Sequence, residues 1–123
     1  MSLLLNLLWL VFGGGLVIFL EYALAGVLLC LTVVGIPFGL QCFKIGALGL
    51  FPFGAALEEG PRSGPLRFGF NVLWFCFAGI WIFATHLVLA VGLALTVIGI
   101  PFALQHLKLG VLALTPFGQR VTR

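Results

Sequence analysis

One phrase is written twice in this chain, and its repetition limits the possible folds more than any other feature. The segment Thr32–Lys44 reads TVVGIPFGLQCFK, and 64 residues later the segment Thr96–Lys108 reads TVIGIPFALQHLK. From Thr32 to Gly54, 15 of 23 positions are identical to their partners, and the pattern NxxW also occurs once in each half. An internal repeat of this length indicates one structural unit that is built twice.

A short charged segment rich in Gly and Pro, EEGPRSGPLR, joins the two copies. This composition is typical of a loop between structured parts. We therefore expect three parts: residues 1–57 as the first repeat, residues 58–67 as a linker and residues 68–123 as the second repeat.

The composition indicates the solvent that surrounds these repeats. Of the 123 residues, 63% are hydrophobic and 7% are charged, whereas soluble domains carry about 45–50% and about 25%. A domain of this size buries only about two thirds of the surface of its unfolded chain, so we predict an all-α integral membrane protein. The first apolar segment also resembles a signal-peptide core. Because the second copy carries the same segment internally, we interpret it as a membrane helix.

Each copy begins with a long apolar run, Leu3–Ile36 in the first and Leu66–Ile100 in the second. The first run has 34 residues and would be about 51 Å long as one helix, whereas the hydrocarbon layer is about 30 Å thick. We therefore expect each run to fold back as a transmembrane hairpin, with turns at the polar pairs Glu21-Tyr22 and Thr85-His86. In chain order, the predicted legs are Leu3–Leu20, Tyr22–Phe38, Leu66–Ala84 and Leu87–Phe102.

These turns would place Glu21 and His86 in water as titrating groups. The alternative is a long bent helix that is hinged at Gly13-Gly14-Gly15. In that case Glu21 is buried and becomes a candidate proton or cation site.

Both apolar runs end in the sequence GIPF, which predicts a helix break. Proline lacks the amide that would continue the helix, yet it begins a new helix readily. The predicted break residues are Gly35, Pro37, Gly99 and Pro101. The segments that follow, Gln41–Phe51 and Gln105–Thr115, have polar residues spaced three apart and therefore on one face. We expect a Pro-started amphipathic helix that lies at the membrane interface or re-enters the membrane.

The charges predict the orientation. With two crossings per copy, the two repeats are parallel, and both termini, the linker and all six basic residues of the chain lie on one side. Basic residues favour the cytoplasmic side of a membrane, so a multi-pass protein with both termini in the cytoplasm is expected. Trp9 and Trp74 are interpreted as anchors at the membrane interface.

These repeated motifs carry a resemblance to a known family. The patterns NxxW, TV[VI]GIPF[GA]LQ with a following Lys, and PFG each occur twice and resemble the YccF-type bacterial inner-membrane component domain. The resemblance implies a location in the bacterial inner membrane and carries no activity over to these residues. The second copy has Ala103 where the first has Gly39, and His106 where the first has Cys42.

The sequence does not predict an enzyme. It contains no Asp, no HExxH, no P-loop and no dinucleotide-binding fingerprint, and its two serines lie at the terminus and in the linker. The cysteines are interpreted as small apolar residues, because their spacing fits neither a disulfide framework nor a metal site. No catalytic residue, metal or cofactor is expected, and the formal charge of +3 is too scattered for nucleic acid.

Two functions agree with these observations. The first is a homo-oligomeric, channel-like permeation component, in which Gln41, Lys44, Gln105 and Lys108 line a path that favours anions. The second is a non-transporting structural or regulatory subunit, whose lysines contact the anionic heads of the phospholipid bilayer or which binds a partner membrane protein. Asn6 and Asn71 are expected to make polar contacts between helices, and the alternative is that they line a polar path.

Overall fold

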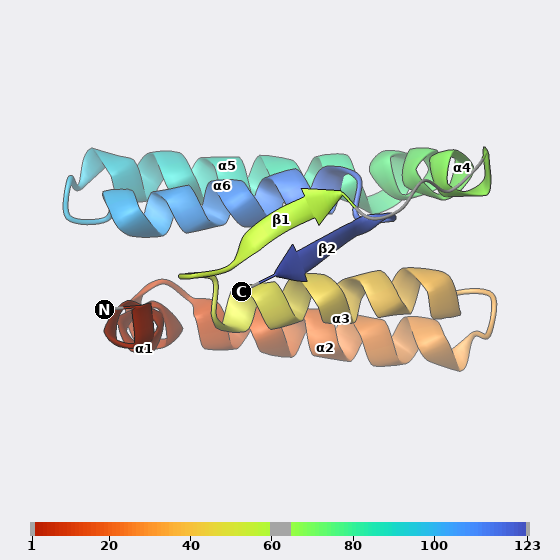
Figure 1. Ribbon diagram of the computed structural model, residues 1–123, viewed down its shortest axis with the longest axis horizontal. Coiled ribbons are helices and arrows are strands. Elements are labelled where there is room, and N and C mark those ends of the chain that lie inside the picture. The colour runs from red at the N-terminus through yellow and green to blue at the C-terminus, as the bar shows by residue number, and fades with distance from the viewer. Residues whose placement is uncertain (1, 60–64, 123) are drawn as a thin grey trace. The chain divides into compact units, whose positions relative to one another are not determined.

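Helices make up most of the structure, a computed structural model that describes residues 2–59 and 65–122. In chain order the elements are α1 (Ser2–Phe12), α2 (Gly15–Leu31), α3 (Ile36–Leu50), β1 (Ala56–Glu59), α4 (Pro65–Trp74), the π-helix η1 (Phe75–Gly79), α5 (Ile80–Leu95), α6 (Ile100–Leu114) and β2 (Gln119–Thr122) (Figure 1). The chain divides into two units: Met1–Ala56 with Val121–Arg123 forms the first, and Leu57–Arg120 forms the second.

The first unit is built on a helical hairpin of α2 and α3. The two helices approach closely because small residues face each other. A Cβ atom added at Gly39 would lie 2.7 Å from the carbonyl oxygen of Gly26 and 2.6 Å from the sulfur of Cys30. Ile45 and Leu48 of α3 are fully buried in this contact. Small residues at such crossings are typical of helices that associate in membranes.

The second unit repeats the hairpin with α5 and α6. Ala90 and Ala103 stand at the positions of Gly26 and Gly39 and are buried. Leu109 and Leu112 are fully buried and take the places of Ile45 and Leu48. The repeat in the sequence therefore corresponds to two hairpins with equivalent cores.

The hairpin turns differ from the predicted ones. Glu21 and Tyr22 lie inside α2, and Thr85 and His86 lie inside α5, so the predicted turns and the four predicted legs are wrong. None of these four residues breaks a helix, whereas glycine and proline do. The chain turns instead between Leu31 and Ile36, and again between Leu95 and Ile100.

Each of these turns contains a predicted helix break and one strained residue. Gly35 directly precedes α3, and Pro37 occupies its first turn; Gly99 and Pro101 do the same in α6. Within the turns, Val33 and Val97 have φ values of 64° and 65°. A β-branched residue in this left-handed region costs about 1–3 kcal/mol, so the turn is held against local strain in both copies.

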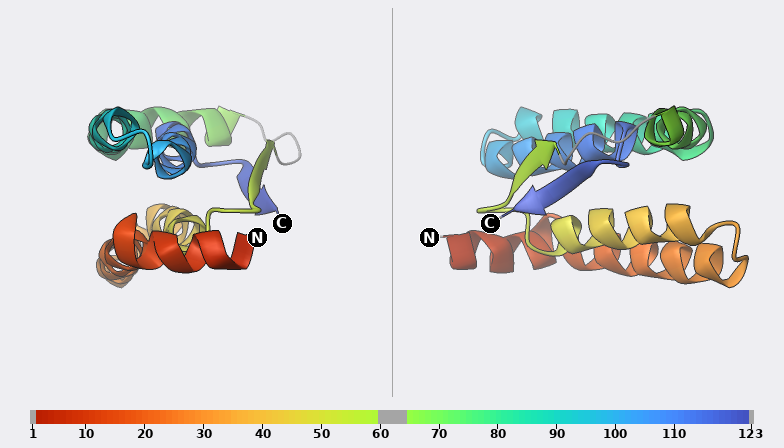
Figure 2. Two further views of the ribbon diagram at one scale, coloured as in Figure 1. Left: turned by 90° about the vertical axis from the view of Figure 1, so that its left-hand side faces the viewer. Right: turned by 45° about the vertical axis from the view of Figure 1, so that its right-hand side comes forward.

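The entrances to the two hairpins differ. In the first unit, α1 and α2 meet at an angle of 74°, and Gly14 at the bend has a left-handed φ of 84°. This is the hinge at Gly13-Gly14-Gly15 that the sequence left open. In the second unit the helix is continuous from Pro65 to Leu95 and contains η1, and α4 still runs across the direction of α5 (Figure 2, left). A π-helical turn is a known cause of such bends.

Fewer helices than expected are long enough to cross a bilayer. Among the residues that the structure describes, one helix qualifies by length and composition, Pro65–Leu95, or two if the bent pair of α1 and α2 counts as one span. The return legs α3 and α6 have 15 residues each, or about 22 Å. The sequence predicted four spanning legs.

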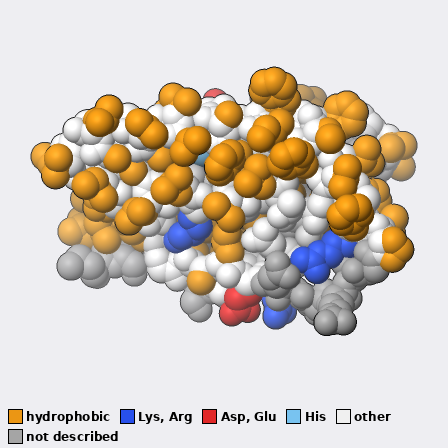
Figure 3. Space-filling view, turned by 90° about the horizontal axis from the view of Figure 1, so that it is seen from above, with side chains coloured by type: hydrophobic (Ala, Val, Ile, Leu, Met, Phe, Trp, Pro, Cys, Tyr) orange, Lys and Arg blue, Asp and Glu red, His pale blue; other side chains and the backbone are white. Residues whose placement is uncertain are grey.

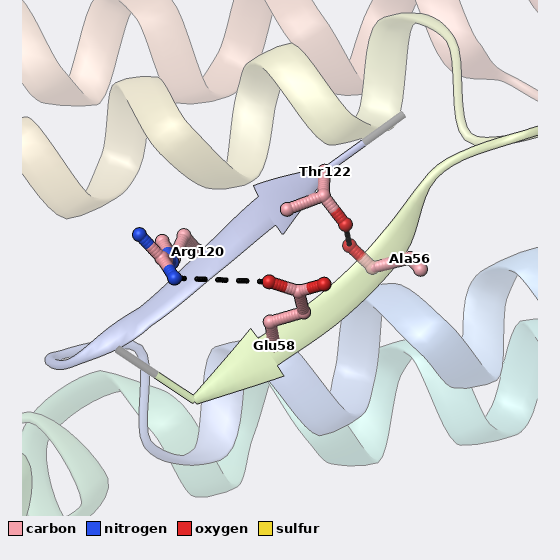
Figure 4. A network of polar contacts seen from close by, with 4 residues as sticks. All are labelled: Ala56, Glu58, Arg120 and Thr122. Atoms are coloured by element: carbon pink, nitrogen blue, oxygen red, sulfur yellow. Dashed lines mark hydrogen bonds and ion pairs between the residues drawn. The ribbon is translucent and has the colours of Figure 1, made fainter. Parts of the chain in front are cut away.

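Two short strands that the sequence did not predict follow the two hairpins. β1 and β2 form a two-stranded sheet. Arg120 and Glu58 approach to 3.8 Å in an ion pair, and the hydroxyl of Thr122 donates to the carbonyl of Ala56 at 3.4 Å (Figure 4). Part of the expected linker therefore belongs to β1 and part to α4, and its residues 60–64 lie outside the described residues.

Candidate functional site

Asparagine and tryptophan side chains make hydrogen bonds at one end of each hairpin, where α3 and α6 end and the sequence PFG follows. We call this end the base. In the first unit the amide of Asn6 donates to the carbonyl of Phe53 at 3.0 Å and accepts from its backbone N–H at 2.9 Å. Asn71 makes the same pair of bonds with Phe117, at 3.0 and 2.9 Å. Both asparagines thus bridge the first helix of their unit to the end of its hairpin.

A tryptophan completes this contact in each unit. The indole N–H of Trp9 donates to the carbonyl of Gly49, and that of Trp74 to the carbonyl of Ala113, both at 2.6 Å. The exposed fractions of the two side chains are 0% and 4%. Their predicted role as interfacial anchors is therefore wrong, because ring and N–H are both used inside the unit. We call the Asn–Trp pair with its backbone partners the base clamp.

The glutamines and lysines lie further along α3 and α6. Lys44 and Lys108 are half-buried, each eight residues after the first residue of its helix, or about 12 Å from that end. The side-chain oxygens of Gln41 and Gln105 are buried, and neither has a hydrogen-bond partner among the described residues. A buried amide oxygen without a partner is costly in an apolar environment.

A polar pair that the sequence did not predict lies inside the second hairpin. The Nδ1 atoms of His86 and His106 are 3.0 Å apart, and their rings are tilted against each other with centroids at 5.2 Å. Both side chains are buried, with exposed fractions of 4% and 2%, so His86 is not a turn residue in water. One nitrogen must donate and the other accept.

The corresponding positions of the first copy carry different residues. Tyr22 stands at the place of His86, and Cys42 at the place of His106. Within residues 2–59 and 65–122, no group of three or more His, Cys or acidic side chains could hold a metal ion.

The remaining surface of the hairpins is largely apolar. Glu21 is exposed on α2 among apolar neighbours, and Arg67 at the second base donates to the carbonyl of Phe117 at 3.1 Å. Hydrophobic side chains are spread across the visible face over α5 and α6 (Figure 3). Helical hairpins with apolar exteriors, in which the backbone groups bond within the helices, are typical of proteins embedded in a membrane.

Comparison with known proteins agrees with this class. The profile of the YccF family, described as an inner membrane component domain, matches residues 4–55 and again residues 69–119. The chain belongs to this family and carries its domain twice, as the sequence motifs predicted. It is a small inner membrane protein.

Its relatives carry the same description. The chain is 28% identical over 117 residues to the inner membrane protein YccF of Escherichia coli K12. The aligned region covers 88% of this chain and 79% of the relative. The corresponding protein of Shigella flexneri matches with the same values. No solved structure matches the chain.

Proposed function

We propose that this protein is a non-transporting structural component of the inner membrane, held there by its two hairpins and by lysine contacts with anionic phospholipid heads. The observation that carries this proposal is the apolar surface of the hairpins away from the base. The side chains that protrude most from the turns, Val34 and Ile98, are apolar, and the threonines of the turns use their hydroxyls inside the turn. Neither turn therefore offers free polar groups to a water-filled path.

The lysines support the contact with lipid heads. Lys44 and Lys108 are half-buried on helices whose other exposed residues are mainly apolar. Long basic side chains at such positions extend toward the interface and bind phosphate there. Arg67 lies at the base of the second hairpin, on the side that we propose to be cytoplasmic, together with both termini.

The proposal is tested with purified protein in vesicles of phosphatidylcholine and phosphatidylglycerol. We expect ion flux equal to that of protein-free vesicles. Native mass spectrometry should show bound phosphatidylglycerol that decreases in a Lys44→Gln, Lys108→Gln variant. Arg120→Gln is the matched control, because Arg120 is 61% exposed and pairs with Glu58. Flux from the wild-type protein, or equal lipid retention by all variants, would contradict the proposal.

A homo-oligomeric permeation component is the second candidate, and one observation favours it. The buried side-chain oxygens of Gln41 and Gln105 have no hydrogen-bond partner among the described residues. A second copy of the chain, or a permeating species, would satisfy both. In this case the protein has a multimeric mass in detergent and conducts ions, and Lys44→Glu reverses the preference for anions. A monomer without flux excludes this candidate.

A further inference from the structure

We propose that the turn of each hairpin, Thr32–Gly35 in the first unit and Thr96–Gly99 in the second, lies within the hydrocarbon of the bilayer. Each hairpin would then enter and leave the membrane through the same face. We call these turns the tips. The inference concerns the depth of the hairpins. It agrees with the non-transporting component proposed above and argues against the permeation component, because a hairpin that does not cross the bilayer cannot line a path through it.

The first argument is that the backbone amides of the tips need no water. In the first tip every backbone amide from Thr32 to Ile36 donates a hydrogen bond, at distances of 2.7 to 3.3 Å, and Pro37 has no amide to satisfy. The second tip repeats these bonds from Thr96 to Ile100. Lipid requires partners for the backbone N–H and C=O groups of any segment within it, and both tips meet the part of this requirement that concerns the N–H groups.

The threonine hydroxyls are satisfied in the same way. Thr32 Oγ1 donates to the carbonyl of Leu29 at 2.6 Å and accepts from the N–H of Gly35 at 2.9 Å. Thr96 makes the equivalent bonds at 2.6 and 3.0 Å. The only polar side chain of each tip therefore closes the turn and offers no free donor to solvent.

The second argument is the side chains that point outward. Val34 is 83% exposed and Ile98 is 90% exposed. Residues 23–40 and residues 87–104 contain no charged residue and no Trp or Tyr. A turn that emerges at the far interface normally carries such residues as anchors, so the composition favours a tip that stays in hydrocarbon.

The third argument is the strained valine. Val33 and Val97 adopt a left-handed backbone in which glycine or asparagine is the usual choice. Both copies place a β-branched apolar residue there and leave it about 70% exposed. A strained residue that occurs twice at the same place indicates a functional constraint, and burial of the valine in lipid supplies one.

The length of the legs agrees with this depth. With 15 residues, α3 and α6 each rise about 22 Å, which is less than the hydrocarbon thickness of about 30 Å. A hairpin that starts at the interface on its base side therefore ends before the opposite headgroups.

Labelling of single cysteines tests the depth of both tips. In a background with Cys30→Ala, Cys42→Ala and Cys76→Ala, Val34→Cys, Ile98→Cys and the control Glu58→Cys are placed in sealed vesicles. A membrane-impermeant maleimide is added outside or trapped inside. Because the thiolate reacts and hydrocarbon suppresses thiol ionisation, we expect both tips to react at least about tenfold more slowly than Glu58→Cys from either side. After solubilisation in SDS all three should react equally.

Each other result overturns the inference. Fast labelling of a tip from the side opposite to Glu58→Cys means that the hairpin crosses the bilayer completely. Fast labelling from the same side as Glu58→Cys means that the hairpin is not inserted. If one variant does not fold, the other tip provides an independent test.

Nitroxide spin labels attached at the same positions give a second measurement of depth. We expect the labels to collide more often with oxygen, which dissolves in lipid, than with a water-soluble nickel chelate. More frequent collisions with the nickel chelate would contradict the proposal.

Discussion

The two units of this protein have the same ends and different middles. The base clamp uses Asn and Trp in both units, and the tip uses Thr, a left-handed Val and Gly in both. Between base and tip, the pair Tyr22 and Cys42 becomes His86 and His106. The comparison teaches that the two ends define the hairpin, whereas its interior accommodates two different pairs of side chains of similar total volume.

The entrance to the hairpin shows how strongly the base is defined. Trp9 and Gly15 are six residues apart, whereas Trp74 and Gly79 are five apart. The first unit accommodates its extra residue with a helix break at Gly14, and the second forms a π-helical turn. A Cβ atom added at either Gly15 or Gly79 would still meet the tryptophan of that unit, at 2.3 and 3.0 Å. The backbone adapts, and the tryptophan contact remains.

Removal of the clamp tryptophan should have the largest effect. Trp9→Ala and Trp74→Ala leave a cavity and an unpaired carbonyl, and we expect each to lower the free energy of unfolding by about 3–5 kcal/mol. The measurement is an SDS unfolding titration from mild detergent. Trp81→Ala is the control, because Trp81 is 68% exposed and its loss should cost less than about 0.5 kcal/mol. A large loss in one unit and a negligible one in the other would break the equivalence of the bases.

A methyl group at the tip glycine should have the next largest effect. At Gly35 an added Cβ would lie 2.4 Å from the carbonyl oxygen of Leu29, and at Gly99 it would lie 2.5 Å from that of Leu93. We expect Gly35→Ala and Gly99→Ala to cost about 1–3 kcal/mol each. Gly92→Ala in α5 has no atom within 4 Å of the new methyl group and should stabilise the protein by about 0.5–1 kcal/mol in the same titration. Neutral substitutions at both tips would contradict the equivalence of the turns.

The asparagines should show a difference between the bases. Asn6→Leu removes both hydrogen bonds with Phe53, a loss of about 2 kcal/mol. Asn71→Leu should cost only about 1 kcal/mol, because Arg67 also donates to the carbonyl of Phe117 and keeps it satisfied. Thermal unfolding in detergent measures both. In the double variant Asn71→Leu, Arg67→Met, the loss of stability should rise to that of Asn6→Leu. An unchanged loss would show that Arg67 does not replace the hydrogen bond of Asn71 to the carbonyl of Phe117.

Exchange of the interior pair should have the smallest effect. His86→Tyr and His106→Cys each leave the other histidine without its partner, whereas the double variant reproduces the pair of the first unit. We expect an interaction free energy of about 1 kcal/mol between the two substitutions, which is a typical value for a hydrogen bond between membrane helices. A double-mutant cycle of unfolding free energies measures this coupling. Strictly additive effects would show that the two histidines do not interact.

The sequence predicted the doubled unit, the membrane class and the location of the helix breaks, because each leaves a local pattern. It misplaced the hairpin turns, because Glu21 and His86 suggested polar turns in an apolar run, although each is compatible with a helix. It also missed the roles of Trp9 and Trp74. Their bonds join residues about 40 positions apart in the sequence, and no local pattern encodes such a contact.

Taken alone, the order of residues determined that this chain is apolar, duplicated and interrupted by proline at matching places, since composition and spacing are properties of the chain itself. Only the tertiary structure decided which polar residues are used inside each unit. A tryptophan N–H or a histidine nitrogen acquires a role when folding brings a partner within hydrogen-bonding distance, and in an apolar environment that partner is what makes the burial of the group favourable.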